Sequence, residues 1–193
     1  GVGKQLFGGL GYNFATPALV GRIAMAMGFA GAMSNYPHPV NNIDAFASAT
    51  PLAVAGQVGS DSYLTLLLGT HGGVLGETCA ITILIGGIFL IATKVISPTI
   101  PVTYLATVAV LSLVAGEDPI YQLLSGGLLL GAFFMATDYV TSPTTTKGKL
   151  IFGLGLGIIT CAIRFLGTKA EGGSCSILRM TLPVPYIEGL TRP

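Results

Sequence analysis

The sequence predicts an all-α integral membrane protein, a polytopic helical bundle, and three observations lead to that prediction. Hydrophobic residues make up 51% of the 193 residues and charged residues only 9%, with a mean hydropathy of +0.77. So few charges cannot cover the surface of a water-soluble domain. Apolar windows wide enough to cross about 30 Å of hydrocarbon as a helix recur along the chain. The 28 glycines, with spacings such as Gly153, Gly155 and Gly157, suit helices that pack closely in lipid.

Six of these windows are candidate spans of a single membrane domain over residues 1–193. They are 17–34, 78–97, 101–116, 120–137, 149–167 and 173–190. Pro17 stands where a helix begins, whereas Pro183 and Pro185 are expected to break or kink the last window. Because the sequence starts inside what reads as a loop, we also expect further helices N-terminal to residue 1.

A long, mostly polar stretch, residues 35–77, separates the first two windows. Its only strongly apolar run, residues 63–68, is too short to span a membrane. We therefore expect a re-entrant segment or a surface turn of helix at that run.

Positive charge in short loops marks the cytoplasmic side of a membrane protein. The stretch 35–71 holds no Lys or Arg, whereas Lys94 lies at the far end of the second window and Lys147 follows the fourth. This alternation predicts a multi-pass protein of the cytoplasmic (inner) membrane whose 35–77 loop is extracytoplasmic. The turn that holds Arg164 and Lys169 is the exception, because the same alternation places it outside.

The sequence also excludes several classes of function. A net charge of +1 without a basic stripe excludes nucleic-acid binding. The three cysteines have no Cys-x-x-Cys spacing, and His38 and His71 are isolated, so we expect no metal site. Neither a Ser-His-Asp set nor a Walker sequence is present to indicate hydrolysis or ATP use, and we expect no catalytic residue of that kind.

A run of small side chains from Asp44 to Pro51 presents the hydroxyl of Thr50. Pro51 favours extended backbone at Thr50, and the neighbours Ser48 and Ala49 leave room for a bulky group. The run is similar to the Asp-x-x-(Ser/Thr)-x-Ala-Thr flavinylation signature, in which the threonine oxygen is joined to the phosphate of FMN. Taken alone, the same string is also typical of an ordinary turn.

Four motifs occur in a fixed order and are more specific together than any one of them. They are Gly8-Gly9-Leu10-Gly11-Tyr12-Asn13, the Thr50 loop, Gly72-Gly73-Val74-Leu75-Gly76-Glu77-Thr78 and the run from Met135 to Gly148. From Gly8 to about Gly167 the chain resembles the D subunit of the Rnf electron-transport complex, and more distantly the B subunit of the sodium-pumping NADH:quinone oxidoreductase. Ala47, Tyr139 and the tail 179–188 depart from the family pattern.

The resemblance implies an electron relay through FMN joined by a phosphoester to Thr50, with Asp44, Ser48 and Ala49 at other motif positions. Its complex would transfer electrons between ferredoxin and NAD and translocate Na⁺ or H⁺, and a second, non-covalent flavin (riboflavin or FMN) is a further possibility. The partners implied are other membrane and peripheral subunits, including an extracytoplasmic FMN subunit and iron–sulfur subunits, and the surrounding lipid. The protein would be inactive alone. A channel or secondary transporter without a redox centre is the alternative, shaped by glycine-rich breaks.

Further polar residues are candidates for a flavin or ion pocket. They are Arg22, Glu77, Asp138, Thr141, Ser142 and Thr144. Glu77 either stabilises a helix N-terminus or serves an ion or proton. Asp138 either caps a turn or lines a second flavin or quinone pocket with the neighbouring hydroxyl groups. Arg22 and Arg164 either extend to the membrane interface or contact a flavin phosphate.

Overall fold

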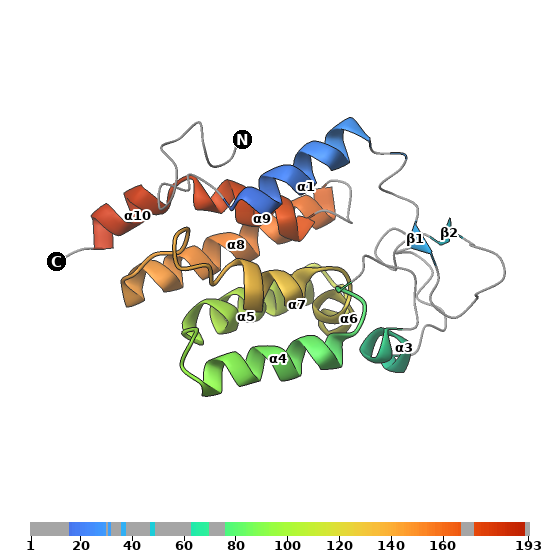
Figure 1. The fold of residues 1–193 in the computed structure, drawn as a ribbon. Helices are drawn as coiled ribbons and strands as arrows, with labels where there is room; N and C mark the ends of the chain where they lie inside the picture. Colours follow the sequence, from blue (N-terminus) through green and yellow to red (C-terminus); the bar gives the residue numbers. More distant parts are fainter. Residues whose placement is uncertain are drawn as a thin grey trace.

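Helices pack side by side along one long axis in the computed structural model (Figure 1), which describes residues 16–29, 31, 36–37, 47–48, 63–69, 76–166 and 172–191. The elements are α1 (Pro17–Gly28), β1 (Tyr36–Pro37), β2 (Ala47–Ser48), α3 (Tyr63–Leu68), α4 (Ala80–Ala92), α5 (Thr99–Val114), α6 (Pro119–Leu124), α7 (Leu128–Leu130), the π-helix η1 (Gly131–Met135), α8 (Thr146–Leu166), α9 (Gly172–Thr181) and α10 (Val184–Thr191). The strands form one short antiparallel pair in which Tyr36 faces Ser48. The predicted helical fold is confirmed for the described residues.

The helices differ in length from the predicted windows. Among the described residues, one helix is long and apolar enough to cross a membrane by length and composition, Thr146–Phe165 within α8. The apolar helices α1, α4 and α5 contain 12, 13 and 16 residues. The count of six spans therefore stays a prediction. The short run 63–68 is helical, as α3, which agrees with the predicted turn of helix.

The window 120–137 does not form one continuous helix. It contains α6, a break at residues 125–127, and then α7 running into η1. Gly126 adopts φ +69°, a left-handed conformation that interrupts helical hydrogen bonding and that glycine tolerates best. The window 173–190 is also divided, into α9 and α10, and the turn at Leu182–Pro183 is the break that the proline predicted.

Glycines let α8 approach its neighbours, as their spacing predicted. A Cβ atom at Gly157 would lie 2.5 Å from the Cβ of Thr107 on α5, and one at Gly153 would overlap the side chain of Thr103. Gly155 faces the opposite neighbour, since a Cβ there would overlap Met180 of α9. Side chains of α5 and α9 therefore occupy the space that the missing Cβ atoms leave on α8.

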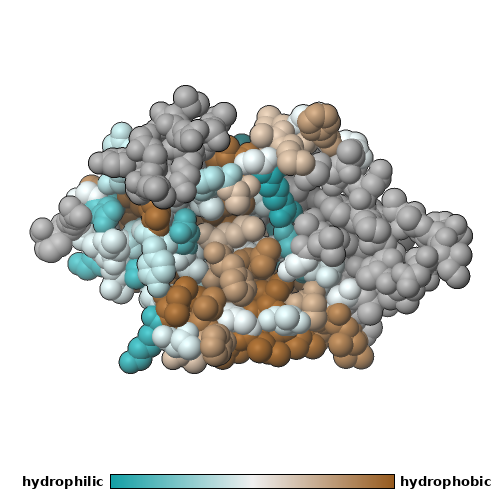
Figure 2. Space-filling view, viewed as in Figure 1, coloured by the Kyte–Doolittle hydropathy of each residue, from teal (hydrophilic) through white to brown (hydrophobic). Residues whose placement is uncertain are grey.

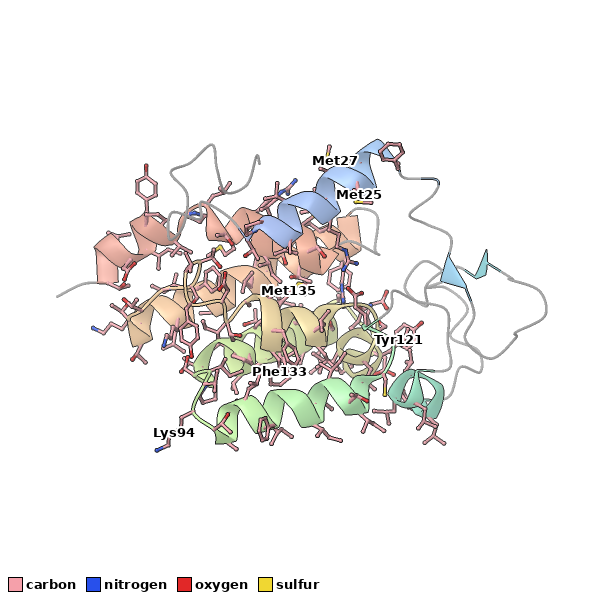
Figure 3. All side chains as sticks on the ribbon, viewed as in Figure 1. Met25, Met27, Lys94, Tyr121, Phe133 and Met135 are labelled. Atoms are coloured by element: carbon pink, nitrogen blue, oxygen red, sulfur yellow. The ribbon has the colours of Figure 1, made fainter. Side chains whose placement is uncertain are left out.

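The interior is apolar and is continuous around α8. Buried Tyr104 and Val108 of α5, Leu128 of α7, Leu156 of α8 and Ile177 of α9 belong to one cluster. A second cluster joins α4 to α7 and η1, where Phe133 points toward α4 (Figure 3) and a Cβ at Gly87 would lie 2.6 Å from its ring.

Apolar side chains also cover much of the outside. Ile81, Ile85, Ile88 and Phe89 are exposed along one side of α4. Figure 2 shows apolar surface continuing along the side of the molecule where α4 lies. Such an extended apolar surface is typical of a helix that faces lipid or another membrane subunit.

The bundle has two chemically different ends. The helix-break end comprises α3, α6, residues 76–79, residues 125–127 and Arg164, and β1 and β2 lie beyond it (Figure 1). The lysine end comprises Lys94 at the close of α4, residues 138–145, and Lys147 and Lys149 in the first turn of α8. A hydrogen bond from the Tyr139 hydroxyl to the carbonyl oxygen of Val95 joins two turns of the lysine end.

Candidate functional site

The candidate site is the polar region around the break between α6 and α7. Asp118 begins α6 by accepting a hydrogen bond from the backbone N–H of Ile120 at 3.1 Å, with Pro119 in the first turn. This short helix ends at Ser125-Gly126-Gly127. A π-helix, η1, follows α7, and π-helical turns are frequent where a helix serves a function.

Arg164 of α8 reaches into this break. Its Nη1 atom donates to the carbonyl oxygen of Gln122 at 2.6 Å and to the side-chain oxygen of Gln122 at 3.0 Å. Its Nη2 atom donates to the carbonyl oxygen of Ser125 at 3.2 Å. These carbonyl groups lie at the end of α6, where a continuing helix would have supplied backbone N–H donors. The guanidinium therefore satisfies acceptors that the break leaves exposed.

The side chain of Arg164 is buried, with 3% of its surface exposed. The interpretation that it extends to the membrane interface is therefore wrong, because the carbonyl acceptors of α6 hold it inside the protein. Within the described part of the chain, its Nε atom has no hydrogen-bond partner, and neither does the buried hydroxyl of Ser125. Each is a buried polar atom in need of a further ligand or water.

An acidic residue lies one side chain away from this cation. The amide nitrogen of Gln122 donates to the carboxylate of Glu117 at 3.4 Å, while its oxygen accepts from Arg164. Gln122 thus connects the two charges without direct contact between them. This arrangement stabilises the guanidinium through dipoles more than through an ion pair.

Glu77 and Arg22, which the sequence analysis selected separately, form an ion pair. The pair joins α1 to the turn before α4, and the side chain of Glu77 is only 9% exposed. A Cβ atom at Gly127 would lie 2.6 Å from the carboxyl carbon of Glu77, so the absence of a side chain at Gly127 admits the carboxylate to the break. The acidic group therefore lies against the start of α7, and Arg22 neutralises it.

A chain of hydroxyl groups continues into the interior below Arg164. The hydroxyl groups of Tyr104 and Thr160 lie 2.7 Å apart, and Thr160 is 2.7 Å from the hydroxyl of Ser176. Ser176 in turn donates to the carbonyl oxygen of Gly173 at 2.8 Å. Each hydroxyl has a partner, so this chain connects α5, α8 and α9 without an unmet donor.

The candidates at the lysine end are not brought to the break. The hydroxyl of Thr141 donates to the carboxylate of Asp138 at 3.2 Å, and the backbone N–H of Ser142 donates to the carbonyl oxygen of Asp138 at 3.1 Å. Thr144 donates to the carboxylate of Glu188 on α10. The geometry of Asp138 matches the turn-capping interpretation. Its alternative, a second flavin or quinone pocket, stays a prediction.

The loop motif falls mostly outside the described residues, which exclude Asp44, Ala49 and Thr50. Of the run from Asp44 to Pro51, only Ala47 and Ser48 are described, as the strand β2. The covalent attachment of FMN therefore stays a prediction that rests on the sequence.

An aspartate and a tyrosine meet at the surface of the helix-break end. The Tyr63 hydroxyl of α3 donates to the carboxylate of Asp118. This hydrogen bond, aided by the backbone N–H of Ile120, lowers the pKa of Asp118 below its ordinary value, and the same bond raises the pKa of Tyr63. Asp118 thus stays ionised while it caps α6.

Within the described ranges, no group of three His, Cys, Asp or Glu side chains could hold a metal ion. The polar atoms gathered at the break are instead carbonyl oxygens, hydroxyl groups and opposite charges on separate helices. Such a set can hold a charged side chain or a small polar ligand, but it offers no nucleophile paired with a base.

Gln122 and Ser125 were not among the residues predicted from the sequence. A signal existed, because Ser125-Gly126-Gly127 interrupts an apolar window, and an arginine in another apolar window needs a polar partner. Nothing in the sequence pairs these two facts, which lie far apart along the chain, so the contact required the structure.

The family model and the similar proteins found by comparison agree on one family. Residues 1–193 match the family described as the NQR2, RnfD, RnfE family. The chain is 46% identical, over 98% of its length, to the D subunit of the Na(+)-translocating ferredoxin:NAD(+) oxidoreductase complex of Acetobacterium woodii. It is 38% identical, over 100% of its length, to the D subunit of the proton-translocating ferredoxin:NAD(+) oxidoreductase complex of Clostridium ljungdahlii. It is 36% identical, again over 100% of its length, to the D subunit of the ion-translocating oxidoreductase complex of Stutzerimonas stutzeri. The chain spans 61%, 64% and 66% of these three relatives.

Proposed function

Because the chain belongs to the NQR2, RnfD and RnfE family, as its motifs predicted, we propose that it is part of a membrane subunit of a redox-driven, ion-translocating complex. The observation that carries the proposal is the family match across all 193 residues, with relatives named as D subunits of ferredoxin:NAD(+) oxidoreductase complexes. The protein relays electrons and relies on other membrane and peripheral subunits, including an extracytoplasmic FMN subunit and iron–sulfur subunits. The ion is Na⁺ in one relative's name and a proton in another's.

We further propose that FMN is attached to Thr50 through a phosphoester. In its favour, Ala47 and Ser48 inside the motif form the strand β2, so the backbone is extended two residues before Thr50. FMN, when bound, supplies the electron transfer. The chain's own part is to anchor and position: Thr50 gives the oxygen, and Asp44, Ser48 and Ala49 form the surrounding motif.

The charge distribution supports an extracytoplasmic position for Thr50. Lys94, Lys147 and Lys149 lie at the lysine end, as expected for the cytoplasmic side. Arg164 had been the exception to this alternation. Because its guanidinium is buried against carbonyl groups, Arg164 is not a loop charge and does not oppose the predicted orientation, whereas Lys169 of the same turn lies outside the described residues.

Two alternatives differ from this proposal in substrate or in class. The B subunit of a sodium-pumping NADH:quinone oxidoreductase shares the family and is a redox protein with another electron acceptor. A secondary transporter or channel without a redox centre is favoured by one observation, the broken helix α6–α7, because discontinuous helices build the substrate sites of many transporters.

The test of the flavin uses the full-length protein in its purified complex. The protein is separated from its partners on a denaturing gel and illuminated. We expect a fluorescent band from the wild type and a dark band from Thr50→Ala. Thr93→Ala is the matched control, because Thr93 is an exposed threonine whose hydroxyl donates only to its own helix, and its band should stay fluorescent. A dark wild-type band would exclude the covalent flavin and leave the transporter.

The redox partners are tested with the same purified complex. Reduction of NAD by reduced ferredoxin supports the Rnf-type proposal, whereas reduction of a quinone by NADH supports the alternative redox complex. Electron transfer in either assay that is lost in Thr50→Ala and retained in Thr93→Ala would link the loop to the relay.

A further inference from the structure

We propose that the carbonyl end of α6 is a site for a monovalent cation, and that the chain fills this site with its own guanidinium, that of Arg164. The inference goes beyond the proposed function and does not depend on a flavin at Thr50. It rests on three features of the break: the acceptors, the charge that they receive, and the atoms that they leave unmet.

The acceptors come from three neutral oxygen atoms on α6 and the residue after it. Two are the carbonyl oxygens of Gln122 and Ser125, and the third is the side-chain oxygen of Gln122, at 2.6, 3.2 and 3.0 Å from guanidinium nitrogens. A cluster of carbonyl oxygens at the end of a helix segment attracts a cation, as it does at the broken helices of transporters. The break at residues 125–127 creates the cluster by removing the N–H donors of a next turn.

The charge is compensated by these dipoles and not by a direct ion pair. Within the described residues, the salt bridge present joins Arg22 to Glu77, and Arg164 takes part in none. Glu117 contributes only through the amide of Gln122. A buried guanidinium with neutral acceptors is costly unless its site is built for positive charge. The site therefore suits a single positive charge, since a divalent ion would require carboxylates among its ligands.

The guanidinium uses only its two terminal nitrogens. Its Nε atom and the hydroxyl of Ser125 are both buried and, among the described residues, both without a partner. A guanidinium whose only role was structural would be expected to use all of its donors. The two terminal nitrogens are thus held as a bound planar cation would be. The Nε atom, which joins them to the rest of the Arg164 side chain on α8, adds no hydrogen bond.

A consequence follows for mobile ions. While the tethered cation occupies the carbonyl oxygens, Na⁺ and K⁺ cannot bind there. A variant without the Arg164 side chain keeps the carbonyl acceptors. Its site should therefore be empty and should accept free guanidinium.

The experiment is chemical rescue of Arg164→Ala in the intact, purified complex. The measured quantity is the thermal midpoint of unfolding. We expect the variant to unfold about 10 °C below the wild type, because buried acceptors lose their donors. Guanidinium at roughly 50 mM, far below the concentrations that denature proteins, should restore most of that loss. Urea, a neutral molecule of the same shape, should not. Arg179→Ala, at an arginine of α9 outside this site, should respond to neither additive.

Equal rescue by urea and guanidinium would overturn the proposal, because binding would then depend on the planar shape of the molecule and not on its positive charge. No rescue by guanidinium would overturn it as well. If Arg164→Ala does not assemble into the complex, the thermal midpoints of Arg164→Lys and Arg164→Met are compared to test the proposal. Lysine keeps a cation, so its complex should be the more stable of the two, and a methionine variant that is equally stable or more stable would contradict a cation site. Neither outcome bears on the fluorescence of the Thr50 band.

Discussion

The two ends of the bundle hold their polar groups in different ways. At the helix-break end, the contacts involve full charges: Arg164 on backbone carbonyl groups, and Arg22 on Glu77 beside Gly127. At the lysine end, the buried or half-buried contacts are made mainly by hydroxyl groups in turns, such as Thr141 on Asp138. A charge removed from water must be matched, whereas a hydroxyl in a turn can return to water at little cost. Substitutions should therefore cost more at the helix-break end.

The largest effect is expected for Glu77→Ala, which leaves Arg22 without its carboxylate. Because the Glu77 side chain is only 9% exposed, the loss should be about 3 kcal/mol in the free energy of unfolding. The thermal midpoint of the purified complex measures it. The double variant Arg22→Ala with Glu77→Ala should recover part of the loss, and simple additivity of the two single losses would contradict the pairing.

A smaller loss is expected for Gly127→Ala at the same end. The new methyl group would lie 2.6 Å from the carboxyl carbon of Glu77 and displace it, at about 2 kcal/mol. The cost should nearly vanish in the Glu77→Ala background, because the obstacle is then gone. Gly189→Ala is the matched control, since nothing lies within 4 Å of its added Cβ, and it should be neutral or slightly stabilising.

At the lysine end, Asp138→Ala should cost about 1 kcal/mol, the worth of the single hydrogen bond from Thr141. Ser142→Ala keeps the main-chain bond to Asp138 and should cost less than Asp138→Ala. The thermal midpoint again measures both. A cost at Asp138 as large as that at Glu77 would erase the difference between the two ends and would indicate a ligand at Asp138.

The smallest effect is a change in pH dependence for Tyr63→Phe. The Tyr63 hydroxyl lowers the pKa of Asp118 in the folded state, so its stabilising effect is present above the ordinary carboxyl pKa of about 4 and is lost as the pH falls through the lowered value. The midpoints of wild type and variant should therefore differ most above pH of about 4 and converge in more acidic buffer. A constant difference across this range would contradict the role of Asp118.

Much of the fold follows from local patterns in the sequence. Hydropathy predicted helices throughout, the close contact at Gly153 and Gly157 was visible in the glycine spacing, and Pro183 marked the division of the last window. The division of 120–137 was missed, because an averaged apolar window hides a short break at Gly126.

The candidate site was less predictable, because its partners are distant in sequence. Arg22 and Glu77 were both selected, each for its own position, but their pairing spans 55 residues. Arg164 finds its acceptors 39 and 42 residues away, on backbone atoms that have no signature in the sequence. Contacts of a side chain with a distant carbonyl group depend on where a helix stops, which only the folded chain determines.

The alternating glycines of α8 limit how the molecule can move. Turning α8 about its axis would drive larger side chains into Thr103 and Thr107 on one flank and into Met180 on the other. These contacts therefore oppose rotation of α8 against α5 and α9. We therefore expect any rearrangement during the proposed electron transfer to occur where α1 meets α9. A crosslink between α5 and α8 should leave that activity intact, whereas one that fastens α1 to α9 should abolish it.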